Sequence, residues 1–180
     1  GVAVVLAIAA AALRMSPATA PAPPSDGAAT DAATGAMQVD YRAIASTPSS
    51  ERLPAISPDG STVAYVRNGE DGRGALMLQA ASQAAARVLT EPGPGQSDTM
   101  PAWSRDGTRI AFVRVSEAGD CSFMVVAASG GEPRAAGPCL DGSWSHFDWT
   151  PDGRGLVMGG PRQPGDAGAP LQRLDLATGR

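Results

Sequence analysis

The chain has 180 residues, a formal net charge of −4, 22 glycines and 16 prolines. Its 14 basic residues are scattered and form no run, which argues against a nucleic-acid-binding surface, because such surfaces gather Lys and Arg in a patch. The high glycine and proline content is typical of a turn-rich β protein or of a chain with an unstructured stretch. We expect both in this chain.

The first 13 residues, Gly1 to Leu13, are wholly apolar, and Arg14 ends the run. A membrane-spanning helix needs about 20 apolar residues, and the sequence begins with Gly, so we interpret residues 1–14 as the end of a transmembrane-type helix. A signal peptide is the alternative, but the charged start is absent, and the pattern Ala18-Thr19-Ala20 would leave Pro21 directly after the cut. A buried core helix is a third interpretation, although no partner helix follows.

Residues 15–39 consist mainly of Pro, Ala, Ser, Thr and Gly. A segment of this composition buries too little apolar surface to order itself. We expect a flexible linker, extended where prolines cluster, that tethers the following domain to the membrane.

Three later segments align with one another without gaps. They read PAISPDGSTVAYV from Pro54, PAWSRDGTRIAFV from Pro101 and FDWTPDGRGLVMG from Phe147. Their starts are 47 and 46 residues apart, close to the roughly 40–45 residues of a four-stranded propeller blade. The spacing predicts three copies of one structural unit.

Each copy has the same local pattern. A large apolar residue (Ile56, Trp103 or Trp149) ends a short strand, and a turn with an Asp-Gly pair follows it. Glycine supplies the positive φ that such a turn needs, and the apolar run after it indicates a strand covered on both faces. The turn residues to which we assign a structural role are Asp59, Gly60, Asp106, Gly107, Asp152 and Gly153.

Further strands are expected downstream of each motif. A third strand is predicted over residues 76–80, 123–127 and 172–176, and a fourth over 87–89 and 134–136. Residues 41–44 resemble that fourth strand, and we expect them to complete the last blade of a propeller.

The three motifs resemble the WD40-like PD40 repeat of TolB-type β-propellers. This resemblance covers about residues 40–180 and implies an all-β fold, a partial, open β-propeller of four-stranded antiparallel blades. A closed propeller needs 4–8 blades, so we interpret the chain as part of a longer protein with exposed apolar edges. Arg105 replaces the proline of the turn, and Gly155 and Gly159 interrupt the third apolar strand.

Cys121 and Cys139 are the only cysteines, and they flank a hairpin centred on Gly130. We predict a structural disulfide across the open end of that hairpin, which places the propeller on the oxidising, extracytoplasmic side of a membrane. Two reduced, buried thiols are the alternative.

His146, the only histidine, lies two residues before Asp148. On an innermost strand the pair could face the central channel and bind a ligand, although a structural pairing is the more ordinary role. The sequence has no zinc-ligand pattern and no nucleophile signature. We therefore expect no catalytic residues, no metal and no cofactor.

Three functions follow from the resemblance alone. The order of apolar helix, linker and propeller is similar to that of ToxR/CadC-like membrane-bound transcriptional regulators, whose winged-helix DNA-binding domain precedes the membrane helix. The propeller would then be a sensory or protein-binding region that itself contacts no nucleic acid. The alternatives are a periplasmic TolB-like envelope adaptor and the N-terminal propeller of a prolyl-oligopeptidase-like serine peptidase.

Overall fold

The computed structural model describes residues 40, 43–45, 47–139, 146–160 and 170–180. The predicted apolar helix over residues 1–14 and the linker over 15–39 lie outside the described residues. Residues Tyr41–Arg180 belong to one compact unit. Among the described residues, no helix is long and apolar enough to cross a membrane.

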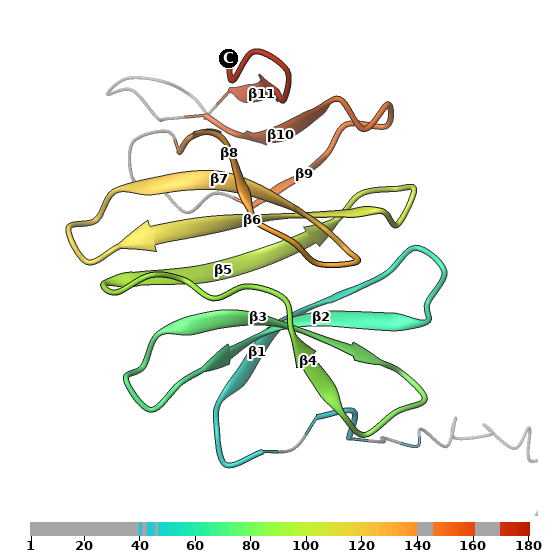
Figure 1. The fold of residues 1–180 in the computed structure, drawn as a ribbon. Helices are drawn as coiled ribbons and strands as arrows, with labels where there is room; N and C mark the ends of the chain where they lie inside the picture. The colour runs from blue at the N-terminus through green and yellow to red at the C-terminus, as the bar shows by residue number, and fades with distance from the viewer. Residues whose placement is uncertain (1–39, 41–42, 46, 140–145, 161–169) are drawn as a thin grey trace, which may run out of the picture. The chain divides into compact units, whose positions relative to one another are not determined.

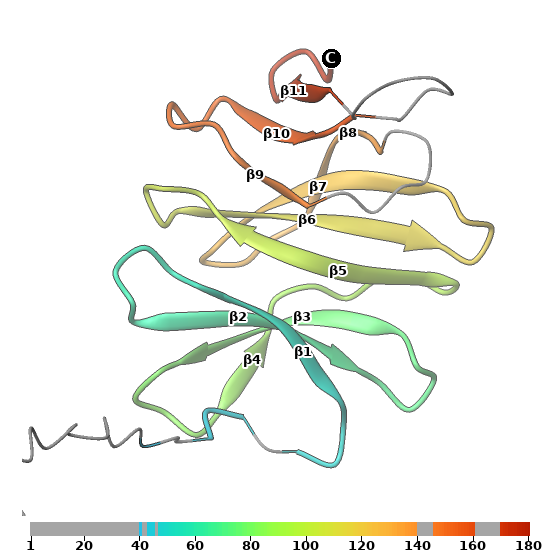
Figure 2. The same cartoon turned by 180° about the vertical axis from the view of Figure 1, so that it is seen from behind.

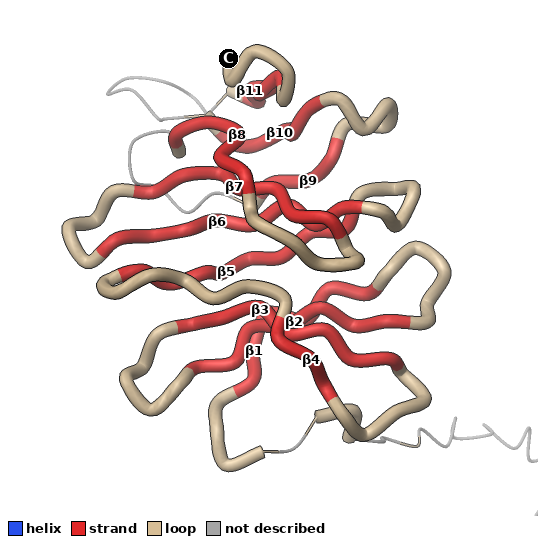
Figure 3. Tube along the Cα trace, in the orientation of Figure 1, coloured by secondary structure: helices blue, strands red, loops and turns tan. Residues whose placement is uncertain are grey.

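The described residues form antiparallel sheets that follow one another along the chain (Figures 1 and 3). The first blade contains β1 (Glu51–Ile56), β2 (Thr62–Asn68), β3 (Gly74–Ala80) and β4 (Ala86–Val88). The second contains β5 (Gln96–Trp103), β6 (Arg109–Ser116), β7 (Cys121–Ala127) and β8 (Arg134–Pro138). The third contains β9 (Phe147–Trp149), β10 (Gly155–Gly159) and β11 (Leu171–Asp175). The predicted all-β architecture with repeated blades is confirmed.

Consecutive strands pair within each blade. The strand orders are β1-β2-β3-β4, β5-β6-β7-β8 and β11-β10-β9, so each blade is an up-and-down meander. The first strands of the blades, β1, β5 and β9, follow one another on one side of the stack, as Figure 2 shows. This is the arrangement of innermost strands in a propeller.

Two local expectations can be compared with the structure directly. The third apolar strand forms through both glycines that interrupt it, since β10 runs from Gly155 to Gly159. The expected closing strand does not form at Ala43 and Ile44, which have no strand structure, and the rest of that segment, residues 41–42, lies outside the described residues. The Ile44 carbonyl instead accepts a hydrogen bond from the buried Gln79 side chain.

The first two blades share an apolar core. One face of β2 and β3 packs against the facing side chains of β6 and β7, and Leu89 closes the edge of this core. Phe112, Leu76 and Ile110 are fully buried there. The predicted coverage of both faces therefore holds for β2 and β6, whose central residues are all buried.

A second core lies between the second and third blades. The opposite face of β6 and β7 packs against β9, β10 and β11, with Trp149, Leu156, Met158 and Leu174 buried from the third blade. Alternate residues of one strand thus serve two different neighbours, as the period-2 geometry of a strand requires.

Tryptophan side chains join successive blades. Trp103 Nε1 donates a hydrogen bond to the Ala55 carbonyl at 3.1 Å, and Trp149 Nε1 donates one to the Ala102 carbonyl at 2.9 Å. In the first copy Ile56 holds this position and is 66% exposed. Each tryptophan therefore fixes its own blade to the blade that precedes it in the sequence.

A buried ion pair stabilises the second blade. Arg114 on β6 contacts both carboxylate oxygens of Asp98 on β5, at 2.7 and 2.8 Å, and Asp98 is fully buried. The first blade has Glu51 and Arg67 at the corresponding positions, 3.8 Å apart. The repeat thus extends upstream of the motifs visible in the sequence.

Candidate functional site

The Asp-Gly turns lie between the first and second strands of each blade. In the first blade, the Ser57 hydroxyl donates to Asp59 Oδ1 at 2.6 Å, and the same Asp59 oxygen accepts from the Ser61 backbone at 3.0 Å. The Thr62 backbone N–H then donates to Ser57 Oγ at 2.9 Å. Gly60 completes the turn with a φ of +73°. The Asp59 carboxylate is therefore occupied within its own turn.

The second and third turns repeat this network. Ser104 Oγ donates to Asp106 at 2.6 Å, and Thr150 Oγ1 donates to Asp152 at 2.5 Å. The pKa of Asp59 is lowered to about 2, mainly because the Ser57 hydroxyl donates a hydrogen bond to its carboxylate. The pKa of Asp106 is lowered to about 2 in the same way by the Ser104 hydroxyl. The pKa of Asp152 is also lowered, mainly by the Thr150 hydroxyl. All three carboxylates are ionised and hydrogen-bonded near neutral pH.

A groove runs between the first and second blades on the side of these turns. Its volume is about 880 Å³, within the range of about 300–1,000 Å³ that ligand sites occupy. Both blades contribute to it: its lining includes Pro58, Asp59, Leu78, Gln79, Ala85, Arg87, Trp103, Arg105, Asp106 and Ala128.

A smaller hollow of about 280 Å³ continues from this groove toward the third blade. Pro58, Trp103 and Arg105 line both spaces. The hollow is completed by residues of the third blade, Asp148, Trp149, Thr150 and Pro151. The two spaces form one surface across three blades, which we call the turn-face groove.

Arg105 supplies an available positive charge at the middle of the turn-face groove. It is exposed, and within the described part of the chain no hydrogen bond or ion pair engages its guanidinium group. Arg87 also lines the groove, and its guanidinium donates to the carbonyl of Ala128. Arg105 is therefore the arginine of the groove lining whose guanidinium has no partner among the described residues.

This groove was not predicted from the sequence. Arg105 stood out only as a departure from the proline of the other two copies. Its neighbours Pro58 and Trp149 come from other blades, 47 and 44 residues away in the sequence, so only the packing of the blades brings them together. The signal that could have found the groove is the combination of Trp at the strand end with Arg in the following turn, which occurs once among the three copies.

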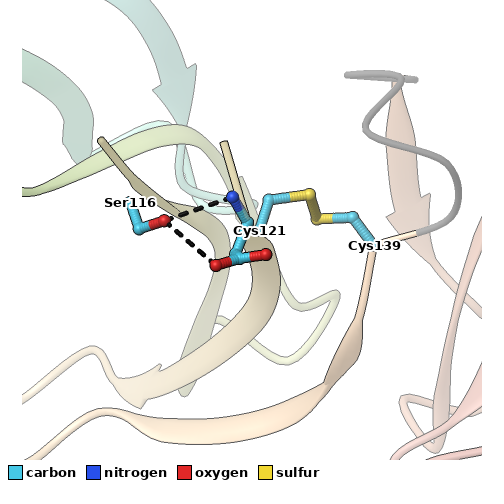
Figure 4. Close-up of a disulfide and its surroundings, with 4 residues drawn as sticks. Ser116, Cys121 and Cys139 are labelled. Carbon is cyan, nitrogen blue, oxygen red and sulfur yellow. Dashed lines mark hydrogen bonds between the residues drawn. A yellow bond between two sulfur atoms is a disulfide. The ribbon is translucent and has the colours of Figure 1, made fainter. Parts of the chain in front are cut away.

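The predicted disulfide is present. Cys121 and Cys139 are joined with a Cα–Cα distance of 5.4 Å, and the Cys139 backbone N–H donates to the Cys121 carbonyl at 3.1 Å. Figure 4 shows the bridge beside the turn where Ser116 Oγ accepts from the Asp120 backbone. Both cysteines pack against the core between the second and third blades. The bridge therefore ties β8 to β7 at the open end of their hairpin.

The predicted His146 and Asp148 pair lies on the third blade. His146 immediately precedes β9, Asp148 belongs to β9, and both residues are exposed. Asp148 Oδ1 accepts from the Trp149 backbone at 2.7 Å and lines the groove. The positions that correspond to His146 in the other copies are Leu53 and Met100, each with a φ of +54° beside a β-bulge. A channel-facing binding role for the pair stays a prediction.

Within the described residues, no group of three or more His, Cys, Asp or Glu side chains is arranged to hold a metal ion. The six turn residues predicted to be structural all lie in the hydrogen-bonded turns described above. The glycines of the second and third turns, Gly107 and Gly153, have positive φ values of +70° and +65°, as Gly60 has in the first turn.

No protein-family model matches the chain, and no curated protein matches it. Solved structures do. TolB from Acinetobacter baumannii is 24% identical, with a TM-score of 0.58, over 76% of this chain and 32% of that one. The β-propeller domain of the trilobed protease from Pyrococcus furiosus is 21% identical, with a TM-score of 0.54, over 73% of this chain and 40% of that one.

Oligogalacturonate lyase from Vibrio parahaemolyticus is 17% identical, with a TM-score of 0.54, over 69% of this chain and 38% of that one. The chain therefore spans between about a third and two fifths of the length of these three proteins. Likeness at this level of identity shows a shared fold. The described residues form a β-propeller region like those of TolB and of peptidase propeller domains.

Proposed function

We propose that the chain is the non-catalytic, extracytoplasmic protein-binding region of a membrane-anchored protein. The observation that carries the proposal is the turn-face groove, which crosses three blades and presents Arg105 without a partner among the described residues. A concave surface with apolar walls and a few directed polar groups is the usual form of a binding site.

The compartment rests on the disulfide. Structural disulfides persist in oxidising compartments and are rare in the cytosol, and the Cys121–Cys139 bridge joins neighbouring strands of a hairpin. The fold likeness to TolB supports the same side of the membrane. The predicted helix over residues 1–14 and the predicted linker over 15–39 supply the proposed anchor and tether.

The proposal of a non-catalytic role rests on how two acidic side chains of the groove, those of Asp59 and Asp106, are used. The Asp59 and Asp106 carboxylates accept hydrogen bonds from their own turns, and a pKa of about 2 keeps both ionised. A general acid must instead hold a proton near the working pH. These two carboxylates are suited to fixing the turns.

The finer proposal is that the whole protein is a transcriptional regulator. It is supported by the order of apolar segment, linker and propeller, which is similar to that of ToxR/CadC-like regulators. Two other candidates have support from the shared fold: a TolB-like envelope adaptor and the propeller of a serine peptidase. The coding sequence on either side separates them, through a winged-helix pattern before Gly1 or a GxSxG motif after Arg180.

Site-specific photocrosslinking tests the interaction role. The full-length protein, expressed in its natural host, receives benzoylphenylalanine at Pro58 in the groove or at Glu70, which is exposed in the β2–β3 turn at the other end of the first blade. We expect a discrete protein adduct from Pro58 and none from Glu70. An adduct from Glu70 alone keeps the interaction role but moves it away from the groove. Absence of adducts at both positions contradicts the proposal.

A further inference from the structure

We infer that the turn-face groove binds an extended segment of a partner protein that carries an acidic side chain beside apolar or proline residues. This inference rests on the proposed protein-binding role and specifies the site and the chemistry of the segment. It is carried by the length of the groove, by its fixed aromatic walls and by the charge at its centre.

The length of the groove fits an extended chain. Its lining passes from the first blade through Trp103 and Arg105 to Pro151 of the third blade. Packed sheets lie about 10 Å apart, so two interblade steps span about 20 Å, which about six extended residues cover at roughly 3.3 Å each.

Two tryptophans of the groove lining are held in place. Trp103 and Trp149 are both fixed by hydrogen bonds from their indole nitrogens to carbonyls of the preceding blade. The Arg109 guanidinium lies 4.7 Å from the Trp149 ring centroid and donates to the Gly153 carbonyl at 2.8 Å, which further fixes that indole. Trp103 is partly exposed, and a rigid aromatic surface binds apolar and proline side chains at a small entropic cost.

The charge at the centre selects an acidic residue. Arg105 lines both hollows and is exposed, and its guanidinium has no partner in the part of the chain that the structure describes. The corresponding residues of the other copies are Pro58 and Pro151, so the turn itself does not require an arginine. A guanidinium offers a planar pair of donors that matches a carboxylate.

The two acidic turn residues beside Arg105 do not remove this preference. The Asp106 carboxylate accepts from Ser104 and from both the backbone and the hydroxyl of Thr108. Asp59 is engaged in the same way by Ser57 and Ser61. The Oδ1 oxygen of each residue is directed into its own turn, whereas the Arg105 guanidinium, without a partner in the described part of the chain, offers its donors to a ligand.

The test uses the full chain and a positional-scanning library of hexapeptides, in which each position in turn is fixed as one amino acid. We expect enrichment of Asp and Glu at one position, with Pro, Leu or aromatic residues enriched next to it. Arg105→Pro restores the repeat proline and should weaken binding of the enriched acidic peptide about tenfold, the usual size of a lost charge-assisted contact. Arg105→Lys keeps the charge but loses the planar pair of donors, so its binding should fall between that of the parent chain and that of Arg105→Pro.

Arg154→Glu is the matched control, because Arg154 is exposed in the corresponding turn region of the third blade and does not line the groove. It changes the net charge without touching the groove and should leave binding within about twofold, since exposed charges are largely screened at physiological salt. Circular dichroism spectra of all variants should match that of the parent chain.

The inference would be overturned if the Arg105→Pro variant still selected peptides with Asp or Glu at the same position. It would also be overturned if the parent chain selected no acidic residue at any position. Binding lost equally in Arg154→Glu would also overturn it, because the effect would then follow net charge. None of these results tests the proposed interaction role itself. That role is tested separately by the crosslinking from Pro58 and Glu70, which detects a partner protein of any chemistry.

Discussion

Trp149 donates a hydrogen bond from its indole nitrogen to the backbone carbonyl of Ala102, 2.9 Å away, and thereby joins the third blade to the second. Trp103 makes the corresponding bond to Ala55. The blades are thus joined through inter-blade hydrogen bonds as well as through their apolar cores.

Replacing Trp149 with Phe keeps an aromatic ring in the core but removes the donor. We expect the free energy of unfolding to fall by about 1–3 kcal/mol, because the Ala102 carbonyl loses its partner. Urea unfolding followed by intrinsic fluorescence of the remaining tryptophans measures the change. Ile56→Ala is the control: Ile56 holds the same position in the first blade but is 66% exposed, so its loss should cost less than about 0.5 kcal/mol. Equal losses for the two variants would show that the hydrogen bond contributes nothing.

The fully buried Asp98 carboxylate accepts two hydrogen bonds from the Arg114 guanidinium. Asp98→Ala should lower the free energy of unfolding by about 3–5 kcal/mol, because it leaves the Arg114 charge without its bidentate partner. Glu51→Ala removes the corresponding carboxylate of the first blade, where the contact is 3.8 Å and both side chains are partly exposed. That variant should cost about 1 kcal/mol or less. Chemical denaturation of the two variants compares the pairs, and a larger loss for Glu51→Ala would contradict the account.

Acid should weaken the turns in a defined pH window. The pKa values of Asp59 and Asp106 are lowered from 3.8 to about 2 in the folded protein, mainly by the Ser57 and Ser104 hydroxyls. A carboxyl whose pKa is lower in the folded state contributes stability above pH 3.8, and this stability is lost as the pH falls toward 2. Thermal melts between pH 5 and 2 should show a falling Tm across that window.

The matched variant for this pH dependence is Asp59→Asn combined with Asp106→Asn. Asparagine keeps an acceptor oxygen in each turn but does not titrate in the acid range. The double variant should be less stable at neutral pH and show a smaller fall in Tm below pH 3.8. An unchanged acid profile would assign the acid sensitivity to other carboxyls.

Gly155 is required by a close approach of two strands. A Cβ at this position would lie 2.7 Å from the Leu174 carbonyl oxygen. Gly155→Ala should therefore destabilise the protein by about 1–3 kcal/mol through overpacking. Gly93→Ala is the control, because its Cβ would meet only the flexible Gln96 side chain, at 3.4 Å. Thermal melts distinguish the two, and equal Tm values would refute the packing argument.

Much of the fold could be predicted from the sequence, because the repeated element is local. The Ser-x-Asp-Gly turn and the apolar strand after it report their own backbone geometry, and the φ of Gly60 is the positive value that the turn requires. The hairpin centre at Gly130 likewise gave the register that brings Cys121 opposite Cys139. Each of these features depends on residues close together in the chain.

The contacts between blades could not be predicted, because they join residues about 47 positions apart through the packing of whole sheets. The tryptophans were expected only to end a strand, and their bonds to Ala55 and Ala102 need the neighbouring blade. Asp98 was missed for a different reason. It lies upstream of the aligned motif, and its counterpart Glu51 is a different acid, so the repeat was not visible there.

The propeller is proposed to lie in an oxidising compartment, where the Cys121–Cys139 disulfide holds the open end of the β7–β8 hairpin. Thiol trapping measures this directly: intact host cells are denatured in a maleimide of known mass without reductant, and the mass of the full-length protein is determined. We expect no maleimide on Cys121 or Cys139 before reduction and labelling of both after it. Modification of both cysteines before reduction would contradict the claim, because the chain would then carry free thiols where it functions.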